Sequence, residues 1–172
     1  RRGDVYAISG VDSEMPFSPT FTHFASGLHE PLGLVVRRER SKGTEFDAVY
    51  GVRRAELTRL VDTNADGRAD SYETYCDDWG VSGNYHEFAF GPAVDKDGNF
   101  FISLNVASNG ASIRPEIRGQ WMEIGLPRED FYGDWGKAKG AAGRMYSRVP
   151  YRGWVMKIDA RTGEVKYEGG RI

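Results

Sequence analysis

The sequence predicts an all-β protein, a partial β-propeller of about two and a half four-stranded antiparallel blades with an irregular insertion. Apolar runs of roughly four to eight residues recur along the chain, bounded by Gly, Pro, Asn or Asp, as half-buried strands are. Aromatic residues make up 13 % of the chain, and 22 glycines supply frequent turns. Long helical periodicity is nearly absent. These observations favour packed antiparallel sheets over a helical fold.

The predicted strands fall into sets that follow one another along the chain. The first two strands end one set, the next four form a complete set, and the last four form another. They cover residues 5–9 and 21–26, then 32–36, 46–52, 56–61 and 72–76, then 87–94, 100–106, 154–158 and 165–167. Tight hairpins are expected at Asp97-Gly98 and at residues 159–163, because Asp and Gly suit their turn positions. Serial sets of antiparallel strands are typical of propeller blades.

Residues 107–152 interrupt the last set and form the expected insertion. This stretch mixes glycine and proline with aromatic side chains, which indicates an irregular segment with one short helix near residues 115–122. A closed propeller needs at least about four blades. We therefore expect residues 1–172 to form a single partial propeller domain within a longer polypeptide.

Composition excludes several classes of protein. The formal net charge of −2 gives no support to a nucleic acid as the partner. No apolar run approaches the roughly 18 residues that a membrane-spanning helix needs, so no membrane span is expected. Cys76 is the only cysteine, which rules out an internal disulfide or a zinc cluster and predicts a buried thiol.

Residues 62–73 match in full the twelve-residue calcium-loop pattern D-x-[DN]-x-[DN]-G-x5-E. Calcium takes about six to eight hard oxygen ligands, and alternate positions of this loop supply them. The expected ligands are Asp62, Asn64, Asp66, the carbonyl of Arg68, Asp70 and Glu73. The flanking residues have the pattern of strands rather than of amphipathic helices, so we expect the loop to join two strands. The alternative is a metal-free hairpin turn rich in Asp and Asn.

His86 follows a glycine-rich aromatic segment and directly precedes a predicted strand. In a propeller, loops that lead into the innermost strand of a blade line the central opening. A histidine there suits a general base, because imidazole titrates near neutral pH. His29 precedes the first strand of the earlier set and so occupies the equivalent position. The alternative for His86 is a hydrogen bond to a neighbouring loop.

Residues 24–34 read F-A-S-G-L-H-E-P-L-G-L and resemble the F-A-S-G-L-x-x-P-x-G-L motif that opens a blade in the soluble glucose and sorbosone dehydrogenase family. Residues 56–62, which run into the calcium loop, and residues 83–91 are similar to a secreted bacterial branch of that family. The resemblance covers most of residues 24–106 and again 153–166. It does not cover the insertion.

The resemblance implies a six-bladed propeller that uses calcium and pyrroloquinoline quinone (PQQ) to oxidise a sugar or another alcohol, with cytochrome c as a possible electron acceptor. It implies that His86, which precedes Phe90-Gly91-Pro92, is the base that removes the alcohol proton. It also implies an extracytoplasmic location, periplasmic or secreted. A second hypothesis is a non-catalytic extracellular propeller that binds a glycan or a protein partner through residues 107–152.

Overall fold

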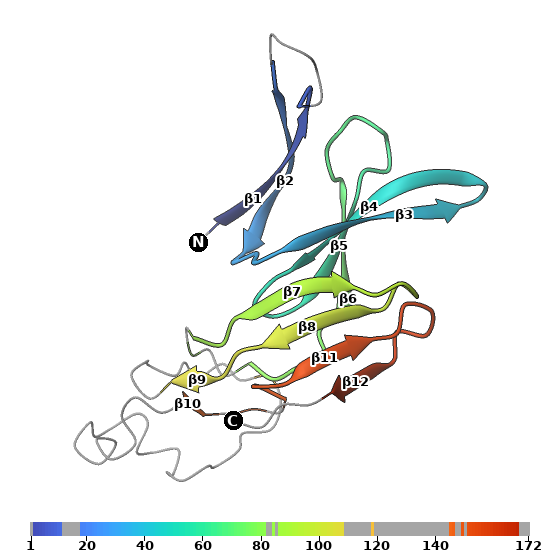
Figure 1. The fold of residues 1–172 in the computed structure, drawn as a ribbon. Helices are drawn as coiled ribbons and strands as arrows, with labels where there is room; N and C mark the ends of the chain where they lie inside the picture. The colour runs from blue at the N-terminus through green and yellow to red at the C-terminus, as the bar shows by residue number, and fades with distance from the viewer. Residues whose placement is uncertain are drawn as a thin grey trace.

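The fold is built entirely from antiparallel strands in the part of the chain that the structure describes. The computed structural model describes residues 2–11, 18–81, 84, 86–108, 118, 145–146, 149 and 151–168. Every regular element within them is a β-strand, and neighbouring strands pair antiparallel in sheets of two to four strands (Figure 1). The all-β prediction is therefore confirmed. Most of the insertion at 107–152, including nearly all of its expected short helix, lies outside the described residues.

The first four-stranded sheet follows the order of the chain. Its strands are β3 (Leu34–Ser41), β4 (Thr44–Val52), β5 (Leu57–Val61) and β6 (Ser71–Cys76), and they lie side by side in that order. The four strands predicted between residues 32 and 76 therefore form one sheet. Lys42 and Gly43 join β3 to β4 with φ of 48° and 86°, and positive φ at both central residues is what a tight two-residue hairpin needs.

The second four-stranded sheet repeats this arrangement. Its strands are β7 (Ala89–Val94), β8 (Phe100–Leu104), β11 (Val155–Ile158) and β12 (Val165–Glu168), in the sheet order β12-β11-β8-β7. The two predicted turns are confirmed, with φ of 86° at Gly98 and 71° at Gly163. Two smaller antiparallel pairs complete the described fold: β1 (Arg2–Ser9) with β2 (Thr20–His29), and β9 (Ala107–Ser108) with β10 (Met145–Tyr146).

Strand β7 begins later than the sequence pattern indicates, at Ala89 instead of residue 87. The residues ahead of it form a turn, in which the Glu87 amide donates to the Asn84 carbonyl at 3.1 Å. The Arg152 guanidinium donates to the carbonyls of Glu87 and Phe88, at 3.1 Å each. The Phe88 carbonyl also accepts from the Asn105 amide at 2.8 Å, and ladder pairing with β8 begins at the next residue, Ala89.

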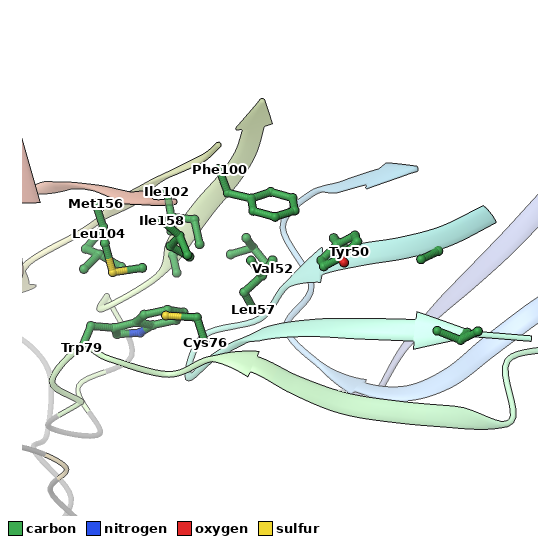
Figure 2. Close-up of a cluster of buried hydrophobic side chains, with 13 residues drawn as sticks. Tyr50, Val52, Leu57, Cys76, Trp79, Phe100, Ile102, Leu104, Met156 and Ile158 are labelled. Carbon is green, nitrogen blue, oxygen red and sulfur yellow. The ribbon is translucent and has the colours of Figure 1, made fainter. Parts of the chain in front are cut away.

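The β1–β2 hairpin, the first sheet and the second sheet stack as three layers, in chain order (Figure 1). The larger core lies between the two four-stranded sheets and gathers buried side chains from both (Figure 2). Its buried members are Ala48, Tyr50, Val52, Leu57, Val61, Cys76, Trp79, Ala89, Phe100, Ile102, Leu104, Met156 and Ile158. The smaller core lies between the hairpin and the first sheet and contains Ala25, Leu28, Val49 and Leu60. The expectation that Cys76 is buried is confirmed.

Strand β5 shows why the first sheet is the middle layer. Side chains alternate across a strand, so Leu57 and Val61 face the second sheet while Leu60 faces the hairpin. Each of these three residues is buried. A strand with apolar residues on both faces is stable only when both faces are covered. Here the second sheet covers one face of β5 and the hairpin covers the other.

The first strands of the two sheets, β3 and β7, lie against one another and run in the same direction (Figure 1). A Cβ atom on Gly33 would lie 2.0 Å from the carbonyl oxygen of Gly91, so glycine is required for this approach. Further along, the Arg37 guanidinium lies over the Phe100 ring, 4.9 Å from its centroid. The sheets therefore have their corresponding ends on the same side.

These two ends have different contents. The turn end holds four connections, namely β3 to β4, β5 to β6, β7 to β8 and β11 to β12. They comprise residues 42–43, 62–70, 95–99 and 159–164. The opposite end holds the segments that precede β3 and β7, and we call it the histidine end because His29 and His86 both lie there. Antiparallel topology thus places the candidate calcium loop and His86 at opposite ends of the sheets.

Candidate functional site

The candidate calcium loop connects β5 to β6 and is shaped by its own acidic side chains. The Asp62 carboxylate accepts hydrogen bonds from the amide of Gly67 at 2.7 Å and from the amide of Asp66 at 3.3 Å. Gly67 has φ of 86° and Ala65 has φ of 61°, so the chain reverses sharply between them. The sequence folds this way locally because Asp62 opens the loop and glycine permits the turn.

The next two candidate ligands repeat this geometry inside the loop. The Asn64 side-chain oxygen accepts from the Asp66 amide at 3.0 Å, and the Asp66 carboxylate accepts from the Arg68 amide at 2.9 Å. Burial would raise the pKa of Asp62, but the surrounding backbone amides lower it overall. The structure therefore brings Asp62, Asn64 and Asp66 together in one turn, with their oxygens drawn toward the loop backbone, and the Arg68 carbonyl follows directly.

The last two candidate ligands are held apart from that turn. Asp70 closes the base of the loop, because its carboxylate accepts from the Thr63 amide at 3.0 Å and from the Thr63 hydroxyl at 2.8 Å. Glu73 lies on β6, and its carboxylate pairs with the Arg59 guanidinium at 2.7 Å. Arg59 also pairs with Glu39 at 2.6 Å, so the Glu73 carboxylate belongs to an ion-pair chain across the sheet. A cation bound by the Glu73 carboxylate would compete with this partner.

The described residues contain no preassembled cluster of three or more His, Cys, Asp or Glu side chains suited to a metal. A cation in the loop would therefore depend partly on the Asn64 amide oxygen, the Arg68 carbonyl and water, which calcium accepts as ligands. A cavity of about 640 Å³ opens beside the loop, and its lining includes Asp62, Thr63 and Glu73. The loop is thus accessible to solvent ions from this side.

The loop is also fixed to the outer layer of the fold. The Ala69 amide donates to the carbonyl of Phe24 on β2 at 2.8 Å, and the Asp70 amide donates to the Val61 carbonyl at 3.0 Å. A Cβ atom added to Gly67 would lie 3.5 Å from the methyl group of Thr22 on β2, so this part of the loop also lies close to β2. The loop therefore joins three strands, namely β2, β5 and β6.

His86 is half-buried in the turn that precedes β7, at the histidine end of the sheets. Its amide donates to the Asn84 side-chain oxygen at 3.0 Å. Its carbonyl accepts from the Asn105 side-chain amide at 3.0 Å and from the Phe88 amide at 2.8 Å. These bonds fix the backbone that carries the imidazole. His29 is exposed at the last position of β2, so the two histidines share an end of the fold but differ in exposure.

Three arginines that sequence reasoning did not select stand at the same end: Arg54, Arg118 and Arg152. Arg152 is 1 % exposed, and its Nε donates to the Gly80 carbonyl at 2.7 Å. Burial lowers the pKa of Arg152 to about 10. The positive charges of Arg54 and Arg118 lower it as well, whereas the negative charge of Glu87 raises it. No local motif marks these residues, because they come from three segments far apart in the sequence.

Comparison with protein-family models, with curated proteins and with solved structures finds no match to this chain. The resemblance to the soluble glucose and sorbosone dehydrogenase family therefore stays a prediction from the sequence. Among the residues that the structure describes, no helix has the length and apolar character to cross a bilayer. The functional argument accordingly rests on the geometry of the calcium loop and of the histidine end.

Proposed function

We propose that this chain contributes blades to a β-propeller that binds calcium outside the cytoplasm. The support for the propeller is the serial stacking of antiparallel sheets, with the first strands β3 and β7 against one another and Gly33, directly before β3, packed against the Gly91 carbonyl. Successive blades of a propeller are related in this way, because their first strands lie nearest the common axis. The support for an extracytoplasmic location is that weak calcium sites, with Kd of about 10⁻⁴ to 10⁻³ M, work where calcium is abundant.

One observation carries the calcium proposal: the twelve-residue pattern lies on a β5–β6 loop whose Asp62, Asn64 and Asp66 oxygens face the same turn. The Asp62 and Asp66 carboxylates repel one another in the absence of a cation, and calcium would remove that repulsion. Its role would be structural, because the loop joins β5 and β6 to β2. The cation would then hold the hairpin layer against the first sheet.

Calcium titration tests this proposal on the whole chain. Thermal unfolding is followed in chelator and in about 10 mM calcium chloride, with magnesium chloride as the comparison. If Kd is about 0.1 mM, the free energy of unfolding rises by about 2.7 kcal/mol. For a chain of 172 residues this raises Tm by about 5–11 °C. No calcium-specific rise would refute the proposal.

A matched pair of variants separates calcium binding from ordinary turn stability. Asp62→Ala removes the carboxylate that organises the loop and should abolish the calcium-dependent rise. Asp159→Ala removes a similar carboxylate, which accepts from the Arg161 amide at 2.8 Å and the Thr162 amide at 2.9 Å in the β11–β12 turn. Asp159→Ala should lower the starting Tm and leave the calcium-dependent rise intact. Equal rises in the two variants would contradict the assigned site.

The position of Glu73 in the site has its own test. If Glu73 exchanges Arg59 for the cation, Glu73→Gln weakens calcium binding, since a carboxylate that can ligate bidentately becomes a neutral amide. If Glu73 stays paired with Arg59, the calcium affinity of Glu73→Gln matches that of the unaltered protein. Isothermal titration of both proteins distinguishes the two arrangements.

A second candidate function is PQQ-dependent oxidation of a sugar or another alcohol, with His86 as the general base and cytochrome c as the electron acceptor. It is favoured by the fixed backbone of His86, held by Asn84 and Asn105 at the histidine end. The test is reconstitution with PQQ and calcium, followed by dye reduction with a panel of sugars and alcohols. The reduction rate should fall in His86→Ala and persist in His29→Ala. Absence of PQQ binding would favour a non-catalytic propeller that binds a glycan or a protein partner.

A further inference from the structure

Three arginine side chains gather around two aromatic residues at the histidine end. The Arg54 guanidinium lies over the Phe88 ring, 5.9 Å from its centroid, and Arg152 Nη1 donates to the Phe88 carbonyl at 3.1 Å. The Arg118 guanidinium lies over the Trp79 ring at 5.7 Å, and the Trp79 indole donates to the Arg54 carbonyl at 3.1 Å. Arg54 and Arg152 therefore approach Phe88 from its ring and from its backbone.

Most of the guanidinium donors in this cluster have acceptors. Arg118 donates through Nε to the Trp79 carbonyl at 2.9 Å and through Nη1 to the Asp77 carboxylate at 3.2 Å. Its Nη2 donates to the carbonyl of Ala55. Arg54 donates through Nη1 to the Glu30 carboxylate at 3.3 Å. Arg118 is thus fully engaged, and Arg54 only in part.

Two donors remain without an acceptor, Nη2 of Arg54 and Nη2 of Arg152. In the described part of the chain, these are the only buried side-chain nitrogen or oxygen atoms without a hydrogen-bond partner. Arg152 is 1 % exposed, and all of its hydrogen bonds to described residues go to backbone carbonyls. Buried polar groups are nearly always satisfied, so two unfilled donors from neighbouring guanidiniums indicate a missing acceptor.

The charges around the cluster indicate that the missing acceptor is an anionic oxygen. Glu30 pairs with Arg54 and Asp77 pairs with Arg118, whereas no carboxylate accepts a hydrogen bond from Arg152 among the described residues. Glu87 is buried nearby and offsets the charge of Arg152 through space. Guanidinium groups form their strongest hydrogen bonds with carboxylate and phosphate oxygens.

We propose that Arg54 Nη2 and Arg152 Nη2 bind one oxyanion, a carboxylate or phosphate group of a small ligand, at the histidine end of the sheets. The site lies at the opposite end from the calcium loop and requires neither calcium nor the quinone. Arg152 also holds the carbonyls of Glu87 and Phe88, so occupation of the site would stiffen the turn that carries His86.

The test uses the whole chain in chelator, without calcium, at constant ionic strength. Sodium chloride is replaced stepwise by sodium phosphate in one series and by sodium acetate in the other, and Tm is measured at each step. The expected result is a saturable rise in Tm with at least one of the two anions, and the series that saturates identifies the group. Isothermal titration with the same anion gives Kd. No saturable rise in either series would refute the site.

Three variants locate the binding. Arg54→Gln should raise Kd at least tenfold, because it removes a charged donor. Arg38→Gln is the control, since Arg38 is an exposed arginine that pairs with Asp47 on the surface of the first sheet, and its Kd should not change. Arg152→Lys keeps the buried charge and removes the fork geometry, so it too should raise Kd. If Arg152→Lys does not fold, the contrast between Arg54→Gln and Arg38→Gln decides alone, and equal Kd values in these two variants would overturn the proposal.

Discussion

The stacking of three layers predicts which leucines of β5 interact with the hairpin. Leu57 and Leu60 both have 0 % exposure, but Leu57 belongs to the core between the two sheets and Leu60 to the core under the hairpin. Leu28 on β2 has 1 % exposure and belongs to the same small core as Leu60. Truncation of Leu28 should therefore affect the contribution of Leu60 and leave that of Leu57 unchanged.

The size of each effect follows from the surroundings of the side chain. Leu57 belongs to a cluster of 13 buried residues between the two four-stranded sheets, so the cavity left by Leu57→Ala cannot collapse easily and the cost is about 4 kcal/mol. Leu60 shares a cluster of only four buried residues beneath a two-stranded hairpin, so fewer packed neighbours lose contact and we expect Leu60→Ala to cost about 3 kcal/mol. Both values are below the roughly 5–15 kcal/mol that stabilises a typical domain.

Urea denaturation of the single and double variants measures the coupling directly. The double-variant free energy should differ from the sum of the singles by about 0.5–3 kcal/mol for Leu28→Ala with Leu60→Ala. For Leu28→Ala with Leu57→Ala the sum should hold within about 0.5 kcal/mol, because the two side chains belong to different cores. Equal coupling in the two pairs would refute the assignment of the hairpin and the second sheet to opposite faces.

Three further predictions concern backbone geometry and pH. Gly33→Ala should destabilise the fold by about 1–3 kcal/mol in urea denaturation, because its Cβ would lie 2.0 Å from the Gly91 carbonyl oxygen, and an unchanged midpoint would contradict this contact. Gly67→Ala should cost about 1–2 kcal/mol in the same assay, because φ of 86° strains any residue with a Cβ. The pKa of Asp95 is lowered by the Asn99 side chain and that of Asp159 by backbone amides, so their stabilising effect is complete above the unfolded pKa of about 3.9 and is lost as pH falls through the lower folded values. Thermal scans should show Tm falling below about pH 4, with a smaller fall in Asp159→Asn.

The sheets could be predicted because their determinants are local. Short apolar runs separated by turns such as Asp97-Gly98 indicate both the strands and their antiparallel order, and the structure reproduces both four-strand sets. The turn ahead of β7 could not be predicted in the same way, since its Glu87 and Phe88 carbonyls accept hydrogen bonds from Arg152, which lies more than 60 residues away. The local pattern indicates a strand, but it carries no information about the distant side chains that hold the segment leading into it.

In the candidate site, too, local contacts could be predicted from the sequence and contacts between distant segments could not. The contacts among Asp62, Asn64 and Asp66 lie within one turn, so their spacing in the sequence already implies that they meet. Glu73 fits the spacing as well, but Arg59 on the neighbouring strand occupies its carboxylate, and spacing carries no information about that partner. The arginine cluster was missed for the same reason, because its members meet only through tertiary packing.

The link between the calcium loop and β2 has a consequence for local unfolding. Strand β5 is an interior strand with both faces covered, so its amides should exchange with solvent only when the whole domain opens. The β1–β2 hairpin rests on the smaller core and should open on its own at lower free energy. The hydrogen bond from the Ala69 amide to the Phe24 carbonyl ties that hairpin to the loop. Calcium would therefore slow hydrogen exchange most in β2, which belongs to the layer with the least intrinsic protection. The exchange rates of the β5 amides would change least.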